Sequence, residues 1–436
     1  MIRRTNTRIF AVLAAVFMGV TQLGGCGTNT DQKQGDNAAE FTPKLDTQQN
    51  VELQVAGFFG NFEALDQVVN DFNEYYPNVN VSYEQNGDSM LAEYMQNNEY
   101  VDIFMTCDDN VNYPEQTERY VGDYCLDMSK EGIDCSDIQD EIIEGGTVDG
   151  KLLRIPMSQK LYGMAVNVTL LEKEGLKIPE NYKEFCEVCE KLKEKGYTPI
   201  QGATTHVYSD MITNMAMVTI GTDKKLRKQI KEHDGAAAEQ LQPVYERLEE
   251  IIQNGYTKFN VNSTYPEDNY DGAILTFLDG EVPFWICDTE NFSGMKKRES
   301  KSESFSAHPF SYQFMYVPLG DKGVYAYEEP WYGFSINKNS DQLDYAVEFM
   351  RFLTTKKEMD QLASIKGVPS AVKNSDDNSR YTAITEATNL EAEYRNNGEI
   401  DSYVRTYIQN VAANLGKGTY ADAEDAIEGL KQNIEN

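Results

Sequence analysis

Residues 51–83 read VELQVAGFFG NFEALDQVVN DFNEYYPNVN VSY, and this stretch decides the fold class. Apolar and polar residues alternate over Val51–Val55, which is the pattern of a half-buried strand. Apolar residues then recur at helical spacing over 62–72, so the sequence predicts a helix that ends before Pro77. A second run of β-type residues predicts another strand over 79–83.

The same succession of strand and helix continues along the chain. Asn61 is placed to cap the first helix, Met90–Met95 predicts a second short helix, and Val101–Met105 predicts a third strand. The order β-α-β-α-β is typical of a mostly parallel sheet covered by helices, so an α/β fold is expected. Further helices are predicted at Tyr182–Lys195, from an Asn339 cap to Leu353, and at Ile400–Leu415. The end of a helix and a strand are predicted within Thr276–Ile286, and another strand at Phe314–Leu319. The charged stretch Met295–Ser304 predicts a solvated loop.

Composition excludes several classes of protein. The 436 residues are 40% hydrophobic and 11% aromatic, which is ample for a core and excludes wholesale disorder. The formal net charge is −32, from 71 acidic and 39 basic residues. Nucleic acids and anionic membrane surfaces attract clustered Lys and Arg, so neither is expected as a partner.

The N-terminal segment has the features of a targeting signal. Three arginines within the first eight residues precede a twelve-residue apolar run, Ile9–Val20, which is too short to span a bilayer and fits a signal peptide. Leu23–Cys26 resembles the lipobox of bacterial lipoproteins, which implies cleavage before Cys26 and a diacylglyceryl thioether on its sulfur, with acyl chains such as palmitate. We therefore expect a signal peptide at 1–25, a flexible tether at 26–50, and a cell-membrane protein held by a lipid anchor on the extracellular or periplasmic side.

Six further cysteines need an interpretation. Cys186 and Cys189 have the spacing of a redox or metal pair, but apolar residues surround them at helical spacing, which favours the core face of a helix. Cys125 and Cys135 are able to form a disulfide in an oxidising compartment, and the sequence leaves that pairing open.

A family resemblance covers nearly the whole chain after residue 50. The segments that carry it are Gly146–Lys151, Ile155–Gly163 with Asn167, Leu170–Leu176 with Pro179, Lys195–Ile200, Phe277–Glu281, Phe284–Ile286, Gly333–Asn337, Ala346–Phe349 and Gly367–Pro369. In this order they resemble the family-1 extracellular solute-binding proteins of bacterial ABC sugar importers, the group that includes maltose-binding protein.

The resemblance implies a two-lobed, periplasmic-binding-protein-like (type II) α/β fold with a hinge and an interlobe ligand cleft. It places one lobe at 51–157 plus 329–370 and the other at 158–328 plus 371–436, with hinge crossings near Pro156–Leu161, Gly320–Glu328 and Val368–Lys373. It also implies a monomer that captures a small-molecule carbohydrate and delivers it to the transmembrane permease of an ABC transporter, with no catalysis, no cofactor and no metal. Aromatic residues spread over several loops favour an oligosaccharide over a monosaccharide.

Candidate ligand-binding residues are polar or aromatic side chains that follow predicted strands or lie at the hinge, since sugars need flat rings and fixed hydrogen-bonding groups. Trp331 is the leading candidate for a stacking platform, Trp285 is expected in the core, and His206 is as well explained as a surface residue. Phe58 and Phe59 are equally explained as core residues. The full set is Phe58, Phe59, Asn61, Asp109, Asn110, Gln159, Lys160, His206, Tyr208, Asp288, Glu290, Asn291, Trp331 and Tyr332.

Three alternatives stay open at this point. The same fold can bind a peptide, a polyamine or another solute, and it can pass its ligand to a sensor kinase and transport nothing. An exported carbohydrate-active enzyme is the alternative from another class. The chain has no His-Glu-x-x-His or Gly-x-Ser-x-Gly motif and only three histidines, and paired carboxylates arise by chance among 71 acids.

Overall fold

The structure of the protein is a computed structural model that describes residues 41–60, 62–86, 91–97, 101–107, 109–112, 114, 117–259, 270–375 and 389–435. Residues 41–436 form one compact unit, separate from residues 1–40. The predicted signal peptide, the lipobox-like segment with Cys26 and the predicted tether as far as residue 40 therefore lie outside the described residues.

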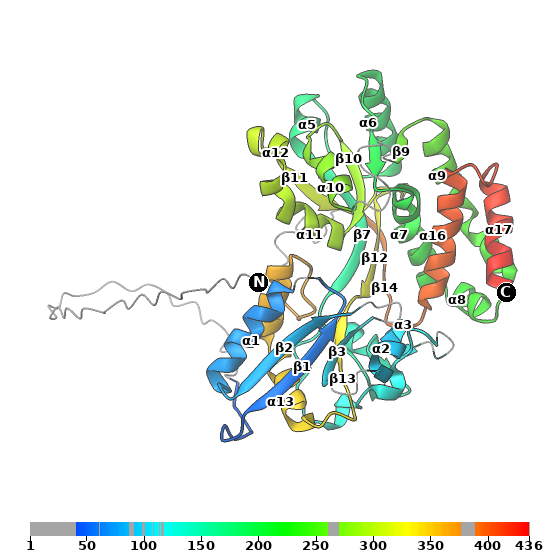
Figure 1. Cartoon of the computed structure of the whole chain (residues 1–436). Coiled ribbons are helices and arrows are strands. Elements are labelled where there is room, and N and C mark those ends of the chain that lie inside the picture. Colours follow the sequence, from blue (N-terminus) through cyan, green and yellow to red (C-terminus); the bar gives the residue numbers. More distant parts are fainter. Residues whose placement is uncertain are drawn as a thin grey trace, which may run out of the picture. The chain divides into compact units, whose positions relative to one another are not determined.

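The first of two large sheets has five strands in the order β2-β1-β3-β13-β6 (Figure 1). β1 pairs in parallel with both β2 and β3, as the alternating sequence predicts, whereas β13 is antiparallel to β3 and β6. The strands are β1 Val51–Gly57, β2 Val79–Gln85, β3 Ile103–Thr106, β6 Ile155–Pro156 and β13 Gly333–Ile336.

Helices cover both faces of this sheet, and we call the sheet with these helices the first lobe. Leu53, Val55 and Ile103 pack with α1, α13 and α14, while Ala56 and Phe104 face α2 and α3. The elements are α1 Glu63–Tyr75, α2 Leu91–Asn97, α3 Asp109–Asn112, α4 Asp140–Glu144, α13 Leu343–Leu353, α14 Lys356–Lys366, the 3-10 turns η2 Gly122–Tyr124 and η3 Met128–Lys130, and the hairpin β4 Thr147–Val148 with β5 Lys151–Leu152.

The second sheet has the order β14-β12-β7-β10-β8-β9, with β11 also paired to β7. β7 runs antiparallel to β10, β11 and β12, and β8 lies parallel to β9 and β10. The strands are β7 Gln159–Asn167, β8 Ile200–Gly202, β9 Thr257–Phe259, β10 Phe284–Asp288, β11 Tyr312–Met315, β12 Val324–Pro330 and β14 Leu390–Arg395.

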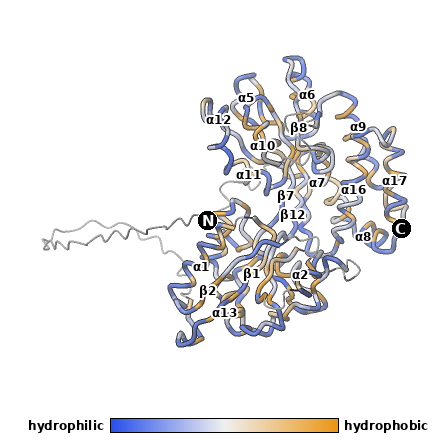
Figure 2. Tube along the Cα trace, in the orientation of Figure 1, coloured by the Kyte–Doolittle hydropathy of each residue, from blue (hydrophilic) through white to orange (hydrophobic). Residues whose placement is uncertain are grey.

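The second sheet and its helices form the second lobe. Its central helix, α7, is buried along most of its length, while the outer helices alternate between hydrophobic and hydrophilic residues in Figure 2 because each has one buried face. The helices are α5 Val168–Lys173, α6 Tyr182–Glu194, α7 His206–Thr222, α8 Lys224–Lys231, α9 Gln242–Gln253, α10 Tyr270–Leu278, α11 Thr289–Arg298, α12 Glu303–Ala307, α16 Ser402–Gly416 and α17 Ala423–Glu435, with 3-10 turns η4 Gly235–Leu241 and η5 Glu299–Lys301.

The two sheets are joined by short passages of chain. β6 of the first sheet ends at Pro156 and β7 of the second begins at Gln159. β12 of the second sheet ends at Pro330, and β13 of the first begins at Gly333. These passages lie within a few residues of the predicted lobe boundaries, which stay a prediction.

Three local predictions are wrong. Phe62, and not Asn61, is the N-cap residue of α1. The stretch 295–304 is helical, in α11, η5 and α12, because Phe292 and Met295 anchor one face in the core and Asp288 and Ser302 cap the helix starts. Helix α13 begins at Leu343 rather than beside Asn339, because the chain first turns through Asn337, whose side chain accepts a hydrogen bond from the Asn339 amide at 3.0 Å.

The cysteines pack as apolar residues. Cys189 is buried on α6 with Cys186 packed beside the same core, which confirms the core face predicted for this helix. Cys125 and Cys135 are both free thiols in the structure, as are the other four cysteines after residue 40. No helix among the described residues has both the length and the apolar run that a membrane span requires.

Candidate functional site

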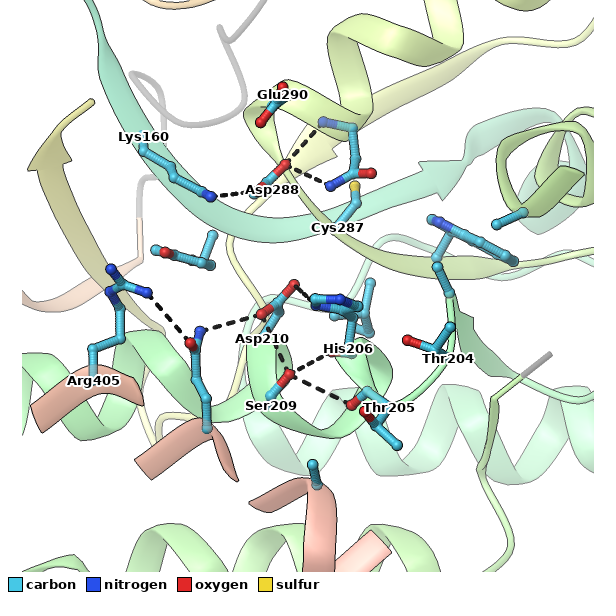
Figure 3. A pocket seen from close by; sticks show the side chains of 18 of the residues that line it. Lys160, Thr204, Thr205, His206, Ser209, Asp210, Cys287, Asp288, Glu290 and Arg405 are labelled. Atoms are coloured by element: carbon cyan, nitrogen blue, oxygen red, sulfur yellow. Dashed lines mark hydrogen bonds and ion pairs between the residues drawn. The ribbon is translucent and has the colours of Figure 1, made fainter. Parts of the chain in front are cut away.

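A cavity of about 650 Å³ opens at the strand ends of the second lobe (Figure 3). Strands β7 and β10, the loop that leads into α7, the first turns of α7 and α11, residues 405–413 of α16 and Ala273 of α10 supply its wall. The residues that line it are Lys160, Tyr162, Ala203, Thr204, Thr205, His206, Ser209, Asp210, Ala273, Trp285, Ile286, Cys287, Asp288, Glu290, Asn291, Arg405, Gln409, Asn410 and Ala413.

Asp288 is the anchor of one side of this wall. It is the last residue of β10 and the N-cap of α11, and its Oδ1 accepts hydrogen bonds from the backbone and side-chain nitrogens of Asn291, both at 2.8 Å. Its Oδ2 lies 2.9 Å from Nζ of Lys160. Burial alone raises the pKa of Asp288, but the ammonium of Lys160 and the bonds from Asn291 hold it below its usual value.

Glu290 lies two residues further along, at the start of α11, and faces the cavity (Figure 3). Burial and the neighbouring Asp288 raise the pKa of its carboxyl group. Its carboxylate forms no hydrogen bond or ion pair with any residue that the structure describes. This side chain is therefore open to a hydrogen bond from a ligand.

His206 and Asp210 form the opposite side, one turn apart at the start of α7. Nδ1 of His206 lies 3.6 Å from Oδ2 of Asp210, and the imidazole side chain is 65% exposed. The hydrogen bond and charge of Asp210 raise the pKa of His206. Gln409 of α16 donates to Oδ1 of Asp210 at 3.2 Å, so two helices orient this carboxylate.

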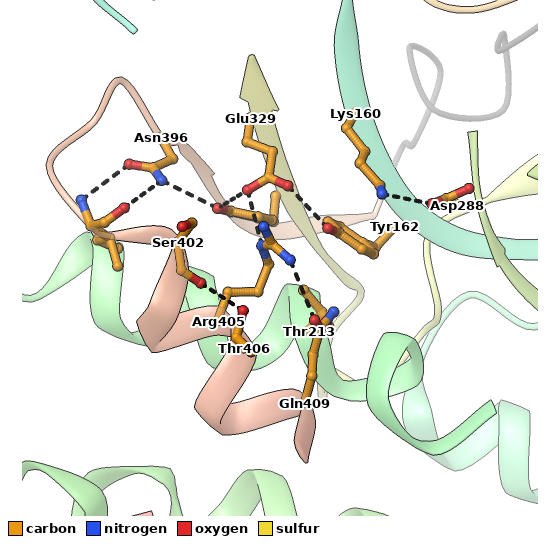
Figure 4. A network of polar contacts seen from close by, with 12 residues as sticks. Lys160, Tyr162, Thr213, Asp288, Glu329, Asn396, Ser402, Arg405, Thr406 and Gln409 are labelled. Carbon is orange, nitrogen blue, oxygen red and sulfur yellow. Dashed lines mark hydrogen bonds and ion pairs between the residues drawn. The ribbon is translucent and has the colours of Figure 1, made fainter. Parts of the chain in front are cut away.

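The back of the cavity is a network around Arg405 (Figure 4). Nε of Arg405 donates to Glu329 at 3.2 Å, and Nη1 donates to Gln409 at 3.3 Å. Tyr162 lies between two cations, with Nζ of Lys160 at 5.4 Å and Cζ of Arg405 at 5.8 Å from its ring centroid. Tyr162 and Trp285 supply the large aromatic side chains of the wall.

The structure brings together five of the predicted ligand residues: Lys160, His206, Asp288, Glu290 and Asn291. Trp285 is 1% exposed and belongs to the core, as expected, but its position also borders the cavity. Sequence reasoning missed Tyr162, Asp210, Arg405, Gln409 and Asn410. The spacing of four residues places Arg405 and Gln409 on one face of a helix predicted to be amphipathic, but the sequence carries no signal that this face borders the cavity.

Four predicted residues gather instead in the first lobe. Phe59, Trp331 and Tyr332 pack edge to face, with ring centroids 5.8 Å apart for Phe59 and Trp331 and 5.1 Å for Phe59 and Tyr332. Phe58 lies 4.9 Å from Phe59 by the same measure. Nζ of Lys366 lies 3.4 Å from the centroid of the Phe59 ring. We call Phe58, Phe59, Trp331, Tyr332 and Lys366 the aromatic cluster; none of the five lines the cavity.

The remaining candidates serve local structure or lie outside the description. The Asn110 side chain bonds to the backbone of Cys107 and Arg119, and that of Gln159 donates to Gln139 at 3.3 Å. Tyr208 is buried in the second-lobe core, where its ring packs on Gly416 and leaves no room for a Cβ there. Asp109 begins α3 without a described side chain, and Asn61 lies outside the described residues.

The wall of the cavity is rich in hydrogen-bonding groups. Carboxylates, amides, hydroxyls and two cations surround two aromatic side chains, which suits a neutral polar ligand with apolar faces. Within the described ranges, no group of three or more His, Cys, Asp or Glu side chains is arranged to hold a metal ion.

Two α/β lobes with a polar cavity at strand ends define the class of two-lobed solute-binding proteins. The family model described as bacterial extracellular solute-binding protein matches residues 59–360, more than half of the chain, and the chain belongs to this family. A curated relative, the "Multiple sugar-binding protein" of Streptococcus mutans, is 21% identical over 350 residues, which cover 76% of this chain and 77% of the relative.

Solved structures share the fold at low sequence identity. The GacH receptor of Streptomyces glaucescens superposes with a TM-score of 0.67 and 13% identity, covering 88% of this chain and 97% of GacH. A sugar transporter protein of Bacillus licheniformis, solved with stachyose, gives a TM-score of 0.65 and 18% identity over 87% of this chain and 98% of that one. At these identities the likeness concerns the fold alone.

Proposed function

We propose that this protein is an extracellular receptor that captures a carbohydrate, specifically an oligosaccharide, and delivers it to the permease of an ABC transporter. The family assignment supports a solute-binding role. The relatives named above include a sugar-binding protein and a structure in complex with stachyose, and these names support the sugar class of ligand.

The observation that carries the proposal is the wall of the 650 Å³ cavity. Hydroxyl groups of a sugar both donate and accept hydrogen bonds, and charged partners that are already fixed strengthen such bonds. Lys160 and Asp288 are fixed by their ion pair, and Asp210 is fixed by Gln409. Tyr162 and Trp285 add apolar groups to the wall, and both rings are almost fully buried.

The first lobe supplies the other half of the binding site in this proposal. The lobes, bounded as the sequence predicts, close on the ligand, and the aromatic cluster then meets the sugar that the cavity holds. Trp331 and Phe59 are the proposed platforms, and the loops at Asn61, Asp109 and Asn110 the proposed polar contacts. Gln159, near the hinge, and Tyr208, near the cavity, are further proposed contacts to the ligand.

Anchoring and delivery complete the proposal. Lipid attached to Cys26, after cleavage of a signal peptide at 1–25, holds the receptor on the outer face of the cell membrane. The receptor acts as a monomer without cofactor or metal, and the ligand leaves unchanged. An extracellular position agrees with the family assignment.

Thermal unfolding of residues 41–436 with a panel of solutes tests the function. The hydrophobic core residues that the structure describes in both lobes all lie within this segment, so the segment contains its own core. The panel contains stachyose, raffinose, maltotriose and glucose, with spermidine and a tripeptide as the other ligand classes. A ligand at 100 times its Kd adds ~2.7 kcal/mol of stability and raises the Tm by several degrees.

We expect an oligosaccharide alone to raise the Tm, and to be recovered intact. Lys160→Met should remove the shift, whereas Lys130→Met, which alters an exposed ion pair of the first lobe, should keep it. A shift with spermidine or the tripeptide alone contradicts the sugar ligand, and hydrolysis of the sugar contradicts the receptor function.

A further inference from the structure

Glu329 lies behind the cavity wall and holds three groups at once (Figure 4). It is part of β12, where it pairs with Lys160 of β7, and its side chain is 12% exposed. Its carboxylate accepts hydrogen bonds from the hydroxyls of Tyr162 at 3.0 Å and Tyr327 at 2.8 Å, and from Nε of Arg405 at 3.2 Å. Glu329 does not itself line the cavity.

A continuous chain of hydrogen bonds leads from Glu329 to the cavity. Arg405 donates to Gln409 at 3.3 Å, and Gln409 donates to Asp210 at 3.2 Å. Asp210 in turn faces His206 across 3.6 Å (Figure 3). Residues separated by almost two hundred positions in the sequence are thus joined in one network.

The charges along this chain explain why Glu329 matters. The Arg405 side chain is only 20% exposed, and a guanidinium group so far out of water needs a carboxylate partner. Nε of Arg405 donates to the carboxylate of Glu329, and Asp210 is the next carboxylate along this chain of hydrogen bonds. Without the charge of Glu329, the carboxylate nearest to the guanidinium along this chain is Asp210, with the amide of Gln409 between the two groups.

We propose that Glu329 is a positioning residue for the ligand site: it retains Arg405 at the back of the cavity, so that Asp210 stays directed at His206 and free to accept a hydrogen bond from a bound hydroxyl. The inference rests on the proposed function in that it takes this cavity as the binding site. The positioning itself is a property of the ligand-free protein and is measurable without a ligand.

His206 provides the measurement, because the chain has only three histidines. The charged groups that act on it are Asp210 of α7, Asp288 at the end of β10, and Lys160 of β7. Residues 41–436 are labelled with ¹³C-histidine, and the ring Cε1–H signals are titrated by NMR. The variants His233→Asn and His308→Asn assign the other two signals, which then serve as internal references.

Glu329→Gln should lower the titration midpoint of His206 by about half a pH unit or more, since a cation that approaches Asp210 weakens its hold on the imidazolium. The double variant with Arg405→Gln should restore the midpoint toward that of the wild type. Glu328→Gln is the matched control. Glu328 is adjacent in β12 but bonds to Tyr316 and Arg395, so the titration midpoint of His206 should stay unchanged in this variant.

An unmoved His206 in Glu329→Gln, an equal shift in Glu328→Gln, or a double variant that keeps the lowered midpoint each overturns the proposal. If Glu329→Gln does not fold, Glu329→Asp shortens the side chain and keeps the charge, and a smaller shift in the same direction is expected; no shift overturns the proposal. Melting with stachyose separates the two hypotheses, because a moved His206 with no sugar response contradicts the ligand class and leaves the positioning intact.

Discussion

The cavity of the second lobe and the aromatic cluster of the first differ in how their side chains are held. In the cavity, polar groups come from helices and strands far apart in sequence and are fixed by hydrogen bonds, as Asp288 is by Asn291 and Lys160. In the aromatic cluster, rings from neighbouring strand ends are fixed by packing on one another, and Trp331 is 8% exposed. The cavity is preorganised for hydrogen bonds, whereas the rings of the aromatic cluster are held by burial and packing.

This difference has a physical consequence for mutation. A ring that is packed on other rings contributes dispersion and burial, so its removal lowers stability whether or not it touches a ligand. A charged group fixed at a cavity wall contributes little net stability, but its partner is left uncompensated when it is removed. Stability and binding therefore have to be measured together on both sides.

Replacement of Trp331 by alanine should have the largest effect on the free energy of unfolding. We expect the free energy of unfolding to fall by about 3–5 kcal/mol, because a packed ring is lost beside Phe59 and Tyr332. If Trp331 is also the platform, the oligosaccharide shift in Tm should disappear. Urea unfolding gives the first quantity and thermal melting the second.

A Trp331→Phe variant is the control, since it keeps an aromatic face and loses less packing. A full sugar shift in Trp331→Ala, with the stability loss present, would make the residue a core element only and place the ligand entirely on the second lobe.

Asp288→Ala should come next, with a loss of about 3 kcal/mol in unfolding free energy. The variant removes the N-cap of α11 and leaves Lys160 without its carboxylate. Asp288→Asn is the matched comparison because it keeps an acceptor for the cap and removes only the charge. Equal losses in the two variants would attribute the effect to the ion pair rather than the cap.

The two lobes also differ in how much of their structure could be predicted from the sequence. The strand-helix-strand order from Val51 follows from local periodicity, so β1, α1 and β2 were predictable. Asp288, Glu290 and Asn291 were predictable as residues of the cavity wall because they end or closely follow a strand. Arg405 and Gln409 were not, because they reach the cavity only through the packing of α16 on α7, a contact without a local pattern.

The stretch 295–304 shows a different limit. Its run of charged residues is typical of a loop, yet Lys296, Lys297 and Arg298 form the last turn of α11, where cations interact favourably with the helix dipole. A charge pattern alone does not distinguish a solvated loop from the exposed end of a helix whose other face is buried.

Replacement of Lys366 in the aromatic cluster should change the free energy of unfolding by less, and should raise it rather than lower it. Burial over the Phe59 ring lowers the pKa of Lys366 to about 8, even though Glu290 acts to raise it. The unfolded chain then holds this proton more tightly than the folded one, so stability should rise between pH 8 and the unfolded pKa of ~10.4. Lys366→Met should lack this rise and be more stable at pH 7 by roughly 1 kcal/mol, after the cation–π contact offsets part of the burial cost.

Parallel urea titrations at pH 7 and pH 9.5 measure this difference. Lys357→Met, on the same helix and bound to Asp71 and Glu358, is the comparison and should lose stability instead. A Lys366→Met variant less stable than the wild type at pH 7 would show that the cation–π contact outweighs burial.

The smallest effect on the free energy of unfolding is expected from the pair of His206 and Asp210 at the cavity. Because Asp210 raises the pKa of His206 in the folded state, the stabilisation is complete below the unfolded pKa of ~6.5 and is lost as the pH rises through the higher folded value. The imidazole is 65% exposed, so we expect only a few tenths of a kcal/mol. Comparison of the wild type with His206→Gln at pH 5.5 and pH 8.5 isolates it. A stability difference that grows toward pH 8.5 would contradict the pairing, and would mean that the second lobe holds its imidazole, like the rings of the first lobe, by packing rather than by charge.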